Sequence, residues 1–171
     1  MSITMYSASV PVFLRVLRNM STWLDKAEAH ATAKKFETSV YLSARLAPDM
    51  LPFVRQVQMT CDAAKFAVAR LTGTEAPKFE DVESTFDELR ERIRKTVAFI
   101  ESVPREKYDA SDDKDIALPR RDGTLNIKGE PYLKHFVLPN LYFHATTTYA
   151  LLRHYGVELG KMDFLGALKE A

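Results

Sequence analysis

Four stretches of the chain place apolar residues at intervals of three and four, the spacing that collects side chains on one face of an α-helix. They cover residues 6–24, 54–71, 86–100 and 133–155, and a glycine or proline follows the last three of them. The stripes consist of Tyr6, Val10, Phe13, Leu14, Leu17, Met20 and Leu24; Val54, Val57, Cys61, Ala64, Val68 and Leu71; Phe86, Leu89, Ile93, Val97 and Ile100; and Leu133, Val137, Leu141, His144, Thr148, Leu151 and Tyr155.

Prolines interrupt the first and the last of these stretches. Pro11 allows two interpretations: a helix capped by Ser9 with the proline in its first turn, or a helix that begins near Thr4 and bends. Pro139 removes its own N–H from the last helix and crowds the carbonyl of His135. We therefore expect a kink between these two residues, or a short helix that meets a longer one.

Residues 105–130 lose the helical spacing. Apolar residues alternate with others over 116–118 and again over 125–127, and the pair Asp122-Gly123 lies between these runs. Alternation on both sides of an Asp-Gly pair predicts a short β-hairpin. Because two strands are marginally stable alone, the hairpin must pack on the helices or on a partner.

Four amphipathic helices, each with one stripe, bury those stripes most simply in a four-helix bundle. At 171 residues the chain is long enough for one hydrophobic core. We therefore predict a single all-α domain over residues 1–171, with the hairpin inserted before the last helix. The long connection between the first two helices leaves the helix directions open, and the apolar tail after Gly156 is expected to fold back on the bundle.

Composition argues against several classes of function. The chain has 24 basic and 23 acidic residues, so its net charge of +1 supplies no field for nucleic acid or an anionic membrane. No apolar run approaches the roughly 18 residues of a membrane span, and the N-terminus lacks the pattern of a secretion signal. Cys61 is the single cysteine, which excludes an internal disulfide, and we expect a cytoplasmic protein. Its place in a stripe indicates a small core residue, not a nucleophile.

His144 is the residue with the most chemical interest, because it lies on the apolar stripe near the middle of the last helix. Three interpretations are open: a buried neutral imidazole with a hydrogen-bond partner, a group for ligand binding or proton transfer, and a metal ligand. Residues nine and ten apart point in different directions, so His135 and His154 do not join it. The usual helical pair of ligands is missing, since Asn140 and Thr148 occupy the positions four before and four after.

Partners for His144 are expected on the second helix, where Gln58 and Asp62 flank the stripe. A buried amide or carboxylate needs hydrogen bonds that offset its desolvation. These two side chains and His144 are therefore predicted to form a small polar pocket, with Thr148 and Tyr149 as further candidates for its lining. An ion pair between Asp62 and a basic neighbour at the surface is the equally ordinary alternative.

Three blocks of sequence resemble a known group of proteins: MYSASVPVFLRVL, RLAPDMLPFVRQVQ with ARLTG, and LPNLYFHATTTYALLRHYGVELGKMDFLG. They look like an uncharacterised bacterial domain-of-unknown-function family in the DinB/YfiT-like superfamily, and the resemblance covers nearly the whole chain. It implies a four-helix bundle with up-down-down-up topology that is commonly dimeric.

The same resemblance implies a metal site. Many members of the superfamily bind nickel or zinc through three histidines, one from the second helix and two from an H-x-x-x-H pair on the fourth. His144 matches the first histidine of the pair, and Thr148 occupies the second position. The second-helix position falls near Gln58 or Met59, and that helix has no histidine. One imidazole with an amide or thioether would hold a metal weakly, so no cofactor is predicted, and nickel or zinc is expected only if the site survives in altered form.

We therefore expect a homodimeric, cytoplasmic, metal-free bundle with a small polar pocket near His144, which binds a small molecule or has a structural role. The alternative is a metal- or thiol-dependent transferase or hydrolase of the superfamily type that uses His144. Neither nucleic acid nor a membrane is an expected partner.

Overall fold

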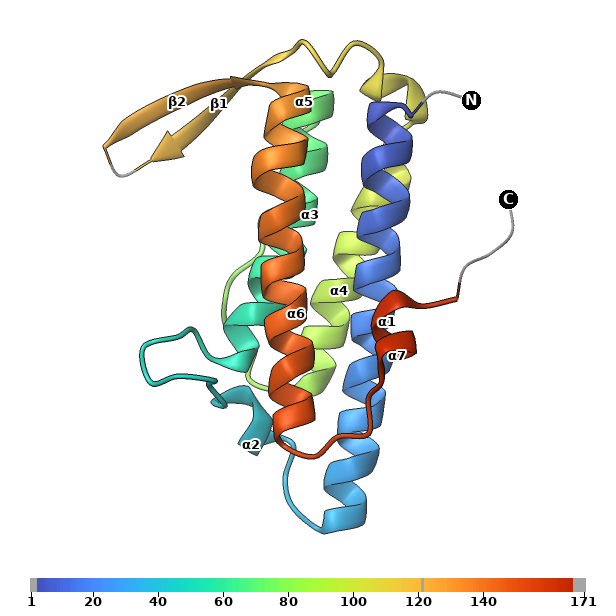
Figure 1. The fold of residues 1–171 in the computed structure, drawn as a ribbon, viewed down its shortest axis with the longest axis vertical. Coiled ribbons are helices and arrows are strands. Elements are labelled where there is room, and N and C mark those ends of the chain that lie inside the picture. The colour runs from blue at the N-terminus through green and yellow to red at the C-terminus, as the bar shows by residue number, and fades with distance from the viewer. Residues whose placement is uncertain (1–2, 121, 168–171) are drawn as a thin grey trace.

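Four long helices form the body of the protein, with a β-hairpin at one end (Figure 1). The computed structural model describes residues 3–120 and 122–167. The long helices are α1 (Met5–Lys34), α3 (Phe53–Thr72), α4 (Phe86–Ser102) and α6 (Leu138–His154). The short elements are α2 (Ser39–Leu42), the 3-10 turn η1 (Arg105–Tyr108), β1 (Asp115–Arg120), β2 (Gly123–Lys128), α5 (Gly129–Tyr132), the π-helical turn η2 (Leu133–Val137) and α7 (Lys161–Leu165). Over the described ranges, no helix is both long and apolar enough to cross a membrane.

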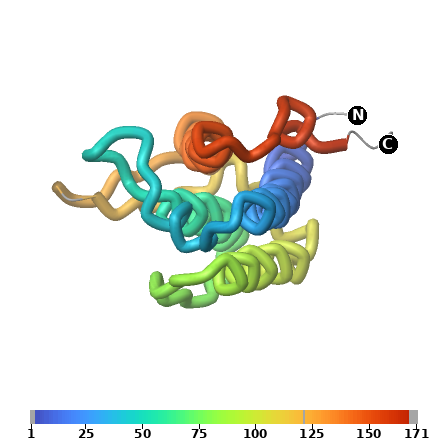
Figure 2. The backbone as a smooth tube through the Cα atoms, turned by 90° about the horizontal axis from the view of Figure 1, so that it is seen from below, coloured from blue at the N-terminus to red at the C-terminus, as the bar shows by residue number. Residues whose placement is uncertain are grey.

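The colours of Figure 1 show that α1 runs down the bundle, α3 and α4 run up, and α6 runs down again. Helix α3 contacts both α4 and α6, and α1 closes the ring against the same two helices (Figure 2). The parallel neighbours α3 and α4 are joined by the long connection 73–85, which returns along the bundle. The predicted all-α bundle with up-down-down-up topology and a hairpin before the last helix is confirmed.

Helix α1 is longer than the apolar stripe that predicted it. The hydroxyl of Thr4 accepts the N–H of Ser7 at 3.1 Å, and the Ser7 hydroxyl accepts the N–H of Thr4 at 2.8 Å. This reciprocal cap starts the helix well before Pro11, so the predicted start near Thr4 is confirmed. At its other end the helix continues past the predicted stripe, because Ala27 and Ala31 extend the buried face.

The π-helical turn η2 lies directly before α6, where the sequence predicts a kink. Pro139 has no N–H to donate to the carbonyl of His135. The N–H of Leu138 bonds instead to the carbonyl of Leu133, five residues back, which widens the turn. The helix therefore continues through Pro139 instead of ending before it.

Strands β1 and β2 pair antiparallel, with Ile116 opposite Ile127 and Leu118 opposite Leu125. These four side chains share one face, because successive strand residues point to opposite sides. Ile116 and Leu118 are buried, while Leu125 and Ile127 pack half-buried against the core. The predicted hairpin is confirmed, and its apolar face packs on the bundle as its marginal stability requires.

The tail after α6 folds back onto α1. Trp23 Nε1 donates to the carbonyl of Asp163 at 2.9 Å, and the indole stacks on Phe164 with ring centroids 5.6 Å apart. Lys26 pairs with the carboxylate of Asp163 at 2.7 Å, and this bond lowers the pKa of Asp163. The predicted return of the tail is confirmed for residues up to 167.

Candidate functional site

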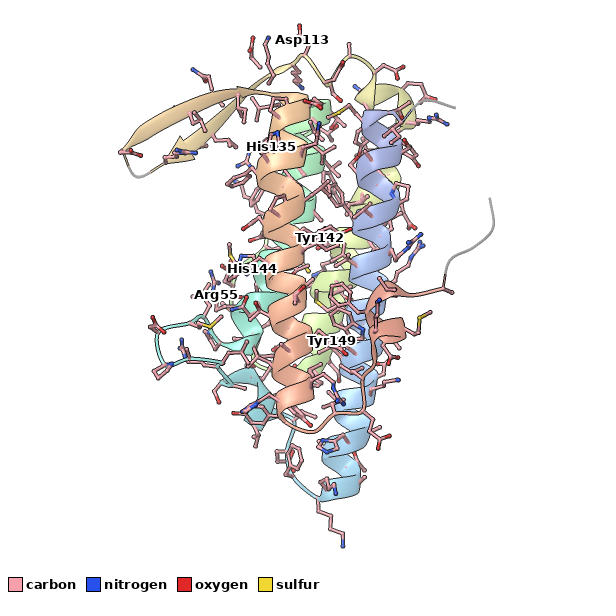
Figure 3. The ribbon with its side chains drawn as sticks, in the orientation of Figure 1. Arg55, Asp113, His135, Tyr142, His144 and Tyr149 are labelled. Carbon is pink, nitrogen blue, oxygen red and sulfur yellow. The ribbon has the colours of Figure 1, made fainter. Side chains whose placement is uncertain are left out.

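His144 lies buried between α6 and α3, where it meets Gln56 (Figure 3). Its Nδ1 lies 2.7 Å from Oε1 of Gln56. The amide nitrogen of Gln56 donates in turn to the carbonyl of Leu51 at 3.0 Å. Only 6% of His144 and 1% of Gln56 are exposed. The three groups form a hydrogen-bonded chain that ties α6 to α3 and to the segment before α3.

This chain of hydrogen bonds fixes which ring nitrogen of His144 carries a proton. A backbone carbonyl only accepts, so the Gln56 group at Leu51 is the NH2 and the group at His144 is the oxygen. Nδ1 must therefore donate, and the neutral ring keeps a lone pair on Nε2. Burial lowers the pKa of His144, which favours the neutral ring at pH 7. The site thus offers one unprotonated nitrogen that accepts a hydrogen bond or a proton.

Thr148 lies one helical turn after His144 and is completely buried. Its hydroxyl donates to the carbonyl of His144 at 2.9 Å, so its proton serves the helix backbone. Phe143 meets the imidazole edge to face with ring centroids 5.2 Å apart, and 56% of Phe143 is exposed. The buried imidazole therefore packs against a ring that is itself partly exposed to solvent.

Gln58 and Asp62 do not join His144, contrary to the predicted pocket. Gln58 donates to Glu83 at 2.6 Å, and Asp62 accepts from Arg92 at 2.9 Å. Gln56, the α3 residue that bonds His144, precedes Gln58 by two positions and Asp62 by six. These offsets rotate Gln58 and Asp62 by about 200° and 240° around the helix axis from Gln56. Gln58 therefore faces the connection 73–85, whereas Asp62 pairs with Arg92 of α4 and also borders the cavity between α3 and α6 that is described below.

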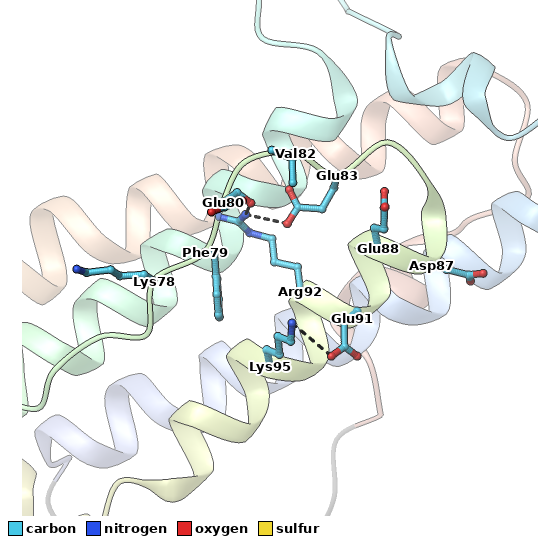
Figure 4. Close-up of a pocket in the computed structure, with 10 residues that line it drawn as sticks. All are labelled: Lys78, Phe79, Glu80, Val82, Glu83, Asp87, Glu88, Glu91, Arg92 and Lys95. Carbon is cyan, nitrogen blue, oxygen red and sulfur yellow. Dashed lines mark hydrogen bonds and ion pairs between the residues drawn. The ribbon is translucent and has the colours of Figure 1, made fainter.

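Arg92 is the centre of this second group, a buried ion cluster between α3 and α4 (Figure 4). Its guanidinium lies 2.9 Å from Asp62, 2.9 Å from Glu83 and 3.0 Å from Asp81, and only 2% of Arg92 is exposed. Lys65, equally buried, pairs with Asp62 at 2.9 Å. Buried charges are stable only when they compensate one another, so the cluster fixes the connection 73–85 onto the helices.

The cavity drawn in Figure 4 adjoins this cluster and has a volume of about 530 Å³. Its carboxylates on α4 already have partners. Glu88 accepts the N–H of Thr85 at 3.0 Å in the helix cap, and Glu91 pairs with Arg94 at 2.6 Å. The cavity is therefore lined by a surface whose charges are largely satisfied within the chain.

Tyr149 is also placed away from His144. Its hydroxyl donates to the carbonyl of Leu159 at 3.3 Å, and its ring packs against Trp23 and Phe164 at centroid distances of 5.8 and 5.6 Å. Five residues turn a helix by about 140°, so the two side chains point to different sides of α6, as Figure 3 shows. This candidate belongs to the packing between α6, α1 and α7.

A small cavity of about 180 Å³, the α3/α6 cavity, opens between the outer sides of these two helices. Its lining residues are Met59, Asp62, Ala63, Phe66, Arg70, Tyr132, Phe136, Val137 and Asn140. Asn140 lies one turn before His144 on α6, but His144 itself does not line the cavity. The volume is below the ~300–1,000 Å³ usual for ligand sites, so the cavity fits only a small group by itself.

Cys61 has no exposed surface, and burial raises the pKa of its thiol to about 12. A nucleophilic cysteine needs a lowered pKa and access to solvent. The structure thus agrees with Cys61 as a core residue.

The profile of the family described as "Domain of unknown function (DUF1993)" matches residues 5–165 of this chain. The chain belongs to the DUF1993 family. The DUF1993 chain is also similar to the crystal structure of a DinB family member protein from Shewanella denitrificans, with 42% sequence identity and a TM-score of 0.92. The match covers 97% of this chain and 94% of that chain, and no curated protein matches. The resemblance to DinB-like proteins of unknown function is confirmed.

The side chains of the DUF1993 chain do not fit the three-histidine metal site that the superfamily resemblance implies. Across residues 3–120 and 122–167, no three His, Cys, Asp or Glu side chains lie close enough to hold a metal ion. At the second-histidine position, the Thr148 hydroxyl is bonded to the backbone. On the second helix Gln56 faces His144, in place of the expected Gln58 or Met59. A neutral amide and a hydroxyl are weak ligands for nickel or zinc beside one imidazole.

Gln56 is the site residue that the sequence analysis missed. It lies between Phe53 and Thr60 on a second buried stripe of α3, beside the apolar stripe that predicted the helix. Gln56 and Thr60 make this stripe partly polar, and the Thr60 hydroxyl donates to the carbonyl of Gln56 at 2.8 Å. The spacing of apolar residues therefore did not detect it. A helix that is buried on two sides carries two stripes of buried residues. The second stripe of α3 was therefore the sequence signal that could have identified Gln56.

Proposed function

We propose that the DUF1993 protein is a homodimeric binding protein that recognises a small organic molecule through His144 without a metal ion. The observation that carries this proposal is the His144–Gln56–Leu51 chain, which leaves a lone pair on Nε2 in a ring held neutral by burial. Such a nitrogen accepts a hydrogen bond from a hydroxyl or N–H group of a ligand. The cytoplasmic location predicted from the sequence stays a prediction.

The α3/α6 cavity supports a ligand with a flat apolar part. Phe66 and Phe136 line it, and Arg70 lies over the ring of Phe66 at 5.2 Å. Asn140, one helical turn before His144, adds an amide to the lining of this cavity. An aromatic alcohol or amine combines the flat apolar surface with the donor that Nε2 accepts.

A catalytic role is the second candidate, and the same lone pair favours it. A buried imidazole that is unprotonated at neutral pH accepts a proton from a substrate, as a general base in a transferase or hydrolase does. The thiol of such a reaction would come from the substrate, because Cys61 is fully buried. Activity that disappears in His144→Gln while phenol binding persists in that variant would favour this candidate over the first.

Nitrogen-detected NMR of the imidazole tests the binding proposal, with phenol as the probe. We expect Nδ1 to be protonated, Nε2 to be unprotonated, and the Nε2 resonance to move when phenol is added. Toluene, which has the ring without the hydroxyl, is the matched control and should leave Nε2 unchanged. A proton on Nε2 in the free protein, or equal shifts with both probes, would contradict the proposal.

Metal analysis tests the other half of the proposal. Untagged protein should contain nickel, zinc and manganese well below one ion per chain, and His144→Ala should not change that content. Stoichiometric metal that disappears with His144→Ala would reject the metal-independent function.

A further inference from the structure

Arg70 on α3 differs from the other shielded arginines because it has no carboxylate partner. Four arginines of the described residues are buried or half-buried, and three of them meet a carboxylate within 3.1 Å. These three are Arg55, Arg90 and Arg92. Arg70, the fourth, is half-buried, and no acidic side chain of the described ranges pairs with it. A charge that is partly withdrawn from water needs compensation, so this guanidinium lacks the anion that the other three have.

Neutral groups surround the Arg70 guanidinium instead. One of its nitrogens donates to the hydroxyl of Tyr132 at 3.0 Å, and the ring centroids of Phe66 and Tyr132 lie 5.2 and 6.0 Å from its central carbon. The last turn of a helix favours a cation, and Arg70 lies in the last turn of α3. The guanidinium is nevertheless bonded to Tyr132 and not to a carbonyl at the helix end. The helix dipole therefore does not account for the direction of this side chain.

Tyr132 adds a second donor at the same place. A guanidinium only donates, so the Tyr132 oxygen accepts from Arg70, and no acceptor of the described residues receives the hydroxyl hydrogen. Burial raises the pKa of Tyr132 although Arg70 opposes this effect, and the hydrogen therefore stays on the oxygen. A positive charge and an O–H donor thus lie side by side.

This pair of donors lines one end of the α3/α6 cavity, where α3 ends near the hairpin (Figure 1). Asp62, the other charged residue of the lining, lies eight residues before Arg70, about 12 Å along the helix. Lys65 and Arg92 each meet Asp62 at 2.9 Å and neutralise it. Salt screens charges at such a separation, so the Arg70 end of the cavity attracts an anion independently of Asp62.

Two exposed aromatic rings flank the Arg70 end. Phe66 lies one turn from Arg70 and is 38% exposed. Phe136 lies one turn from Tyr132, is 43% exposed, and stacks on Tyr132 with ring centroids 5.9 Å apart. Ligand sites combine aromatic walls with a few polar groups in this way. A cavity of about 150 Å³ holds one benzene ring, so the 180 Å³ present here has room for one ring with a small substituent.

We propose that the Arg70 end of the α3/α6 cavity binds the carboxylate of a small aromatic acid. The planar guanidinium matches the two oxygens of a carboxylate, and the Tyr132 hydroxyl donates a further hydrogen bond. The ring of the acid packs against Phe66 and Phe136. One guanidinium balances one negative charge, whereas the nearly two charges of a phosphate ester would need a second cation that the lining does not supply.

This site goes beyond the function proposed for His144. Gln56, which bonds His144, precedes Arg70 by fourteen residues, about 21 Å along α3. An acid with a single ring therefore does not contact both groups. The Arg70 end binds its ligand whether or not His144 binds one.

NMR titration with benzoate tests the site, with the Nε–H resonance of Arg70 as the reporter. Benzoate should shift this resonance and saturate the protein at millimolar concentration or below. Benzamide has the same shape without the charge, and acetate has the charge without the ring. Each should bind at least about 10-fold more weakly than benzoate. Equal affinities for benzoate and benzamide, or no binding of benzoate at millimolar concentration, overturn the proposal.

Variants locate the binding. Arg70→Met should weaken benzoate binding at least about 10-fold, because a charge-assisted hydrogen bond is lost. Arg15→Met, which removes an exposed guanidinium from α1, is the matched control and should bind as the wild type does. Tyr132→Phe keeps the buried ring and should weaken binding less than Arg70→Met. Far-UV circular dichroism establishes that each variant is folded, and Phe136→Ala, which removes an exposed ring and should also weaken binding, replaces Arg70→Met if that variant is not. Binding of wild-type strength in a folded Arg70→Met variant, or in its replacement, overturns the site.

The outcomes separate this site from the function proposed for His144. His144→Gln should bind benzoate as tightly as the wild type, and loss of benzoate binding in this folded variant contradicts a site that is independent of His144. Benzoate binding in a protein whose His144 Nε2 does not respond to phenol rejects the His144 function alone. A response to phenol without benzoate binding rejects the Arg70 site alone.

Discussion

The two outer sides of the bundle differ in the residues that they present. Helices α1 and α4, both described in full, have no large apolar side chain exposed. Ion pairs cover them instead: Arg90 on α4 pairs with Asp25 and Glu28 on α1, and Arg18 pairs with Glu101. On the other side, Phe66 is the one exposed residue of α3, every residue of which is described. The α1/α4 side is therefore covered by paired charges, whereas the α3/α6 side exposes aromatic rings to solvent.

The two buried contacts of α3, with α4 and with α6, also differ in charge. The contact between α3 and α4 holds the charged cluster around Arg92, and the contact between α3 and α6 holds the neutral chain through Gln56. Unpairing a buried charge costs more than unpairing a buried neutral group. The predictions below compare these two contacts, beginning with the charged one.

The largest loss of stability is expected for Arg92→Met. This change removes a buried guanidinium and leaves the partly buried carboxylates of Asp62 and Glu83 without their main partner, and should lower the free energy of unfolding by about 3–5 kcal/mol. Urea denaturation of the purified protein measures it. The matched control is Arg94→Met on the exposed side of α4, which should change the unfolding midpoint much less. Equal shifts for the two variants would show that the cluster is not a stabilising contact.

A smaller loss is expected for Gln56→Leu. The change leaves the Leu51 carbonyl and the His144 Nδ1–H without their partner, and should cost about 1–3 kcal/mol. A double-mutant cycle with His144→Phe provides the control. Because both single changes break the same bond, the double variant should lose less stability than the two losses added together. Strict additivity would contradict the hydrogen-bonded chain.

The contrast between the two contacts also shows what sequence patterns reveal. The helices, the hairpin and the irregular turn before Pro139 follow from local rules: apolar spacing, an Asp-Gly pair, and a missing N–H. Such features depend on residues close in sequence, and they were predicted with boundaries that the structure extends mainly in α1.

The partners of the polar side chains depend on rotation about α3, and this is where prediction was wrong. Gln56 and Gln58 are chemically identical and two residues apart, but Gln56 faces α6 and Gln58 faces the connection 73–85. Hydrophobic spacing located one buried side of α3 and placed Gln58 and Asp62 beside it. It could not indicate that α6 contacts the side with Gln56, because the packing of four helices is decided by the whole core.

The smallest expected effect is the pH dependence of the contact between α3 and α6. Burial lowers the pKa of His144 in the folded state, so the unfolded state binds a proton more readily at this residue. The stability that comes from the neutral ring is complete above the unfolded pKa of about 6.5 and is lost as the pH falls below it. The loss is steepest at about 1.4 kcal/mol per pH unit if His144 alone titrates.

Urea denaturation between pH 7 and pH 5 measures this dependence, with His144→Gln as the comparison. Asp163 and Glu88 have lowered pKa values, because hydrogen bonds from Lys26 and from the Ser84 backbone favour their charged forms. Their stabilisation is present above the unfolded carboxyl pKa of about 4, so it does not change in this window. The other three histidines are common to both proteins. The wild type should therefore lose more stability than His144→Gln toward pH 5, and parallel curves would show that His144 is not held neutral by its burial against α3.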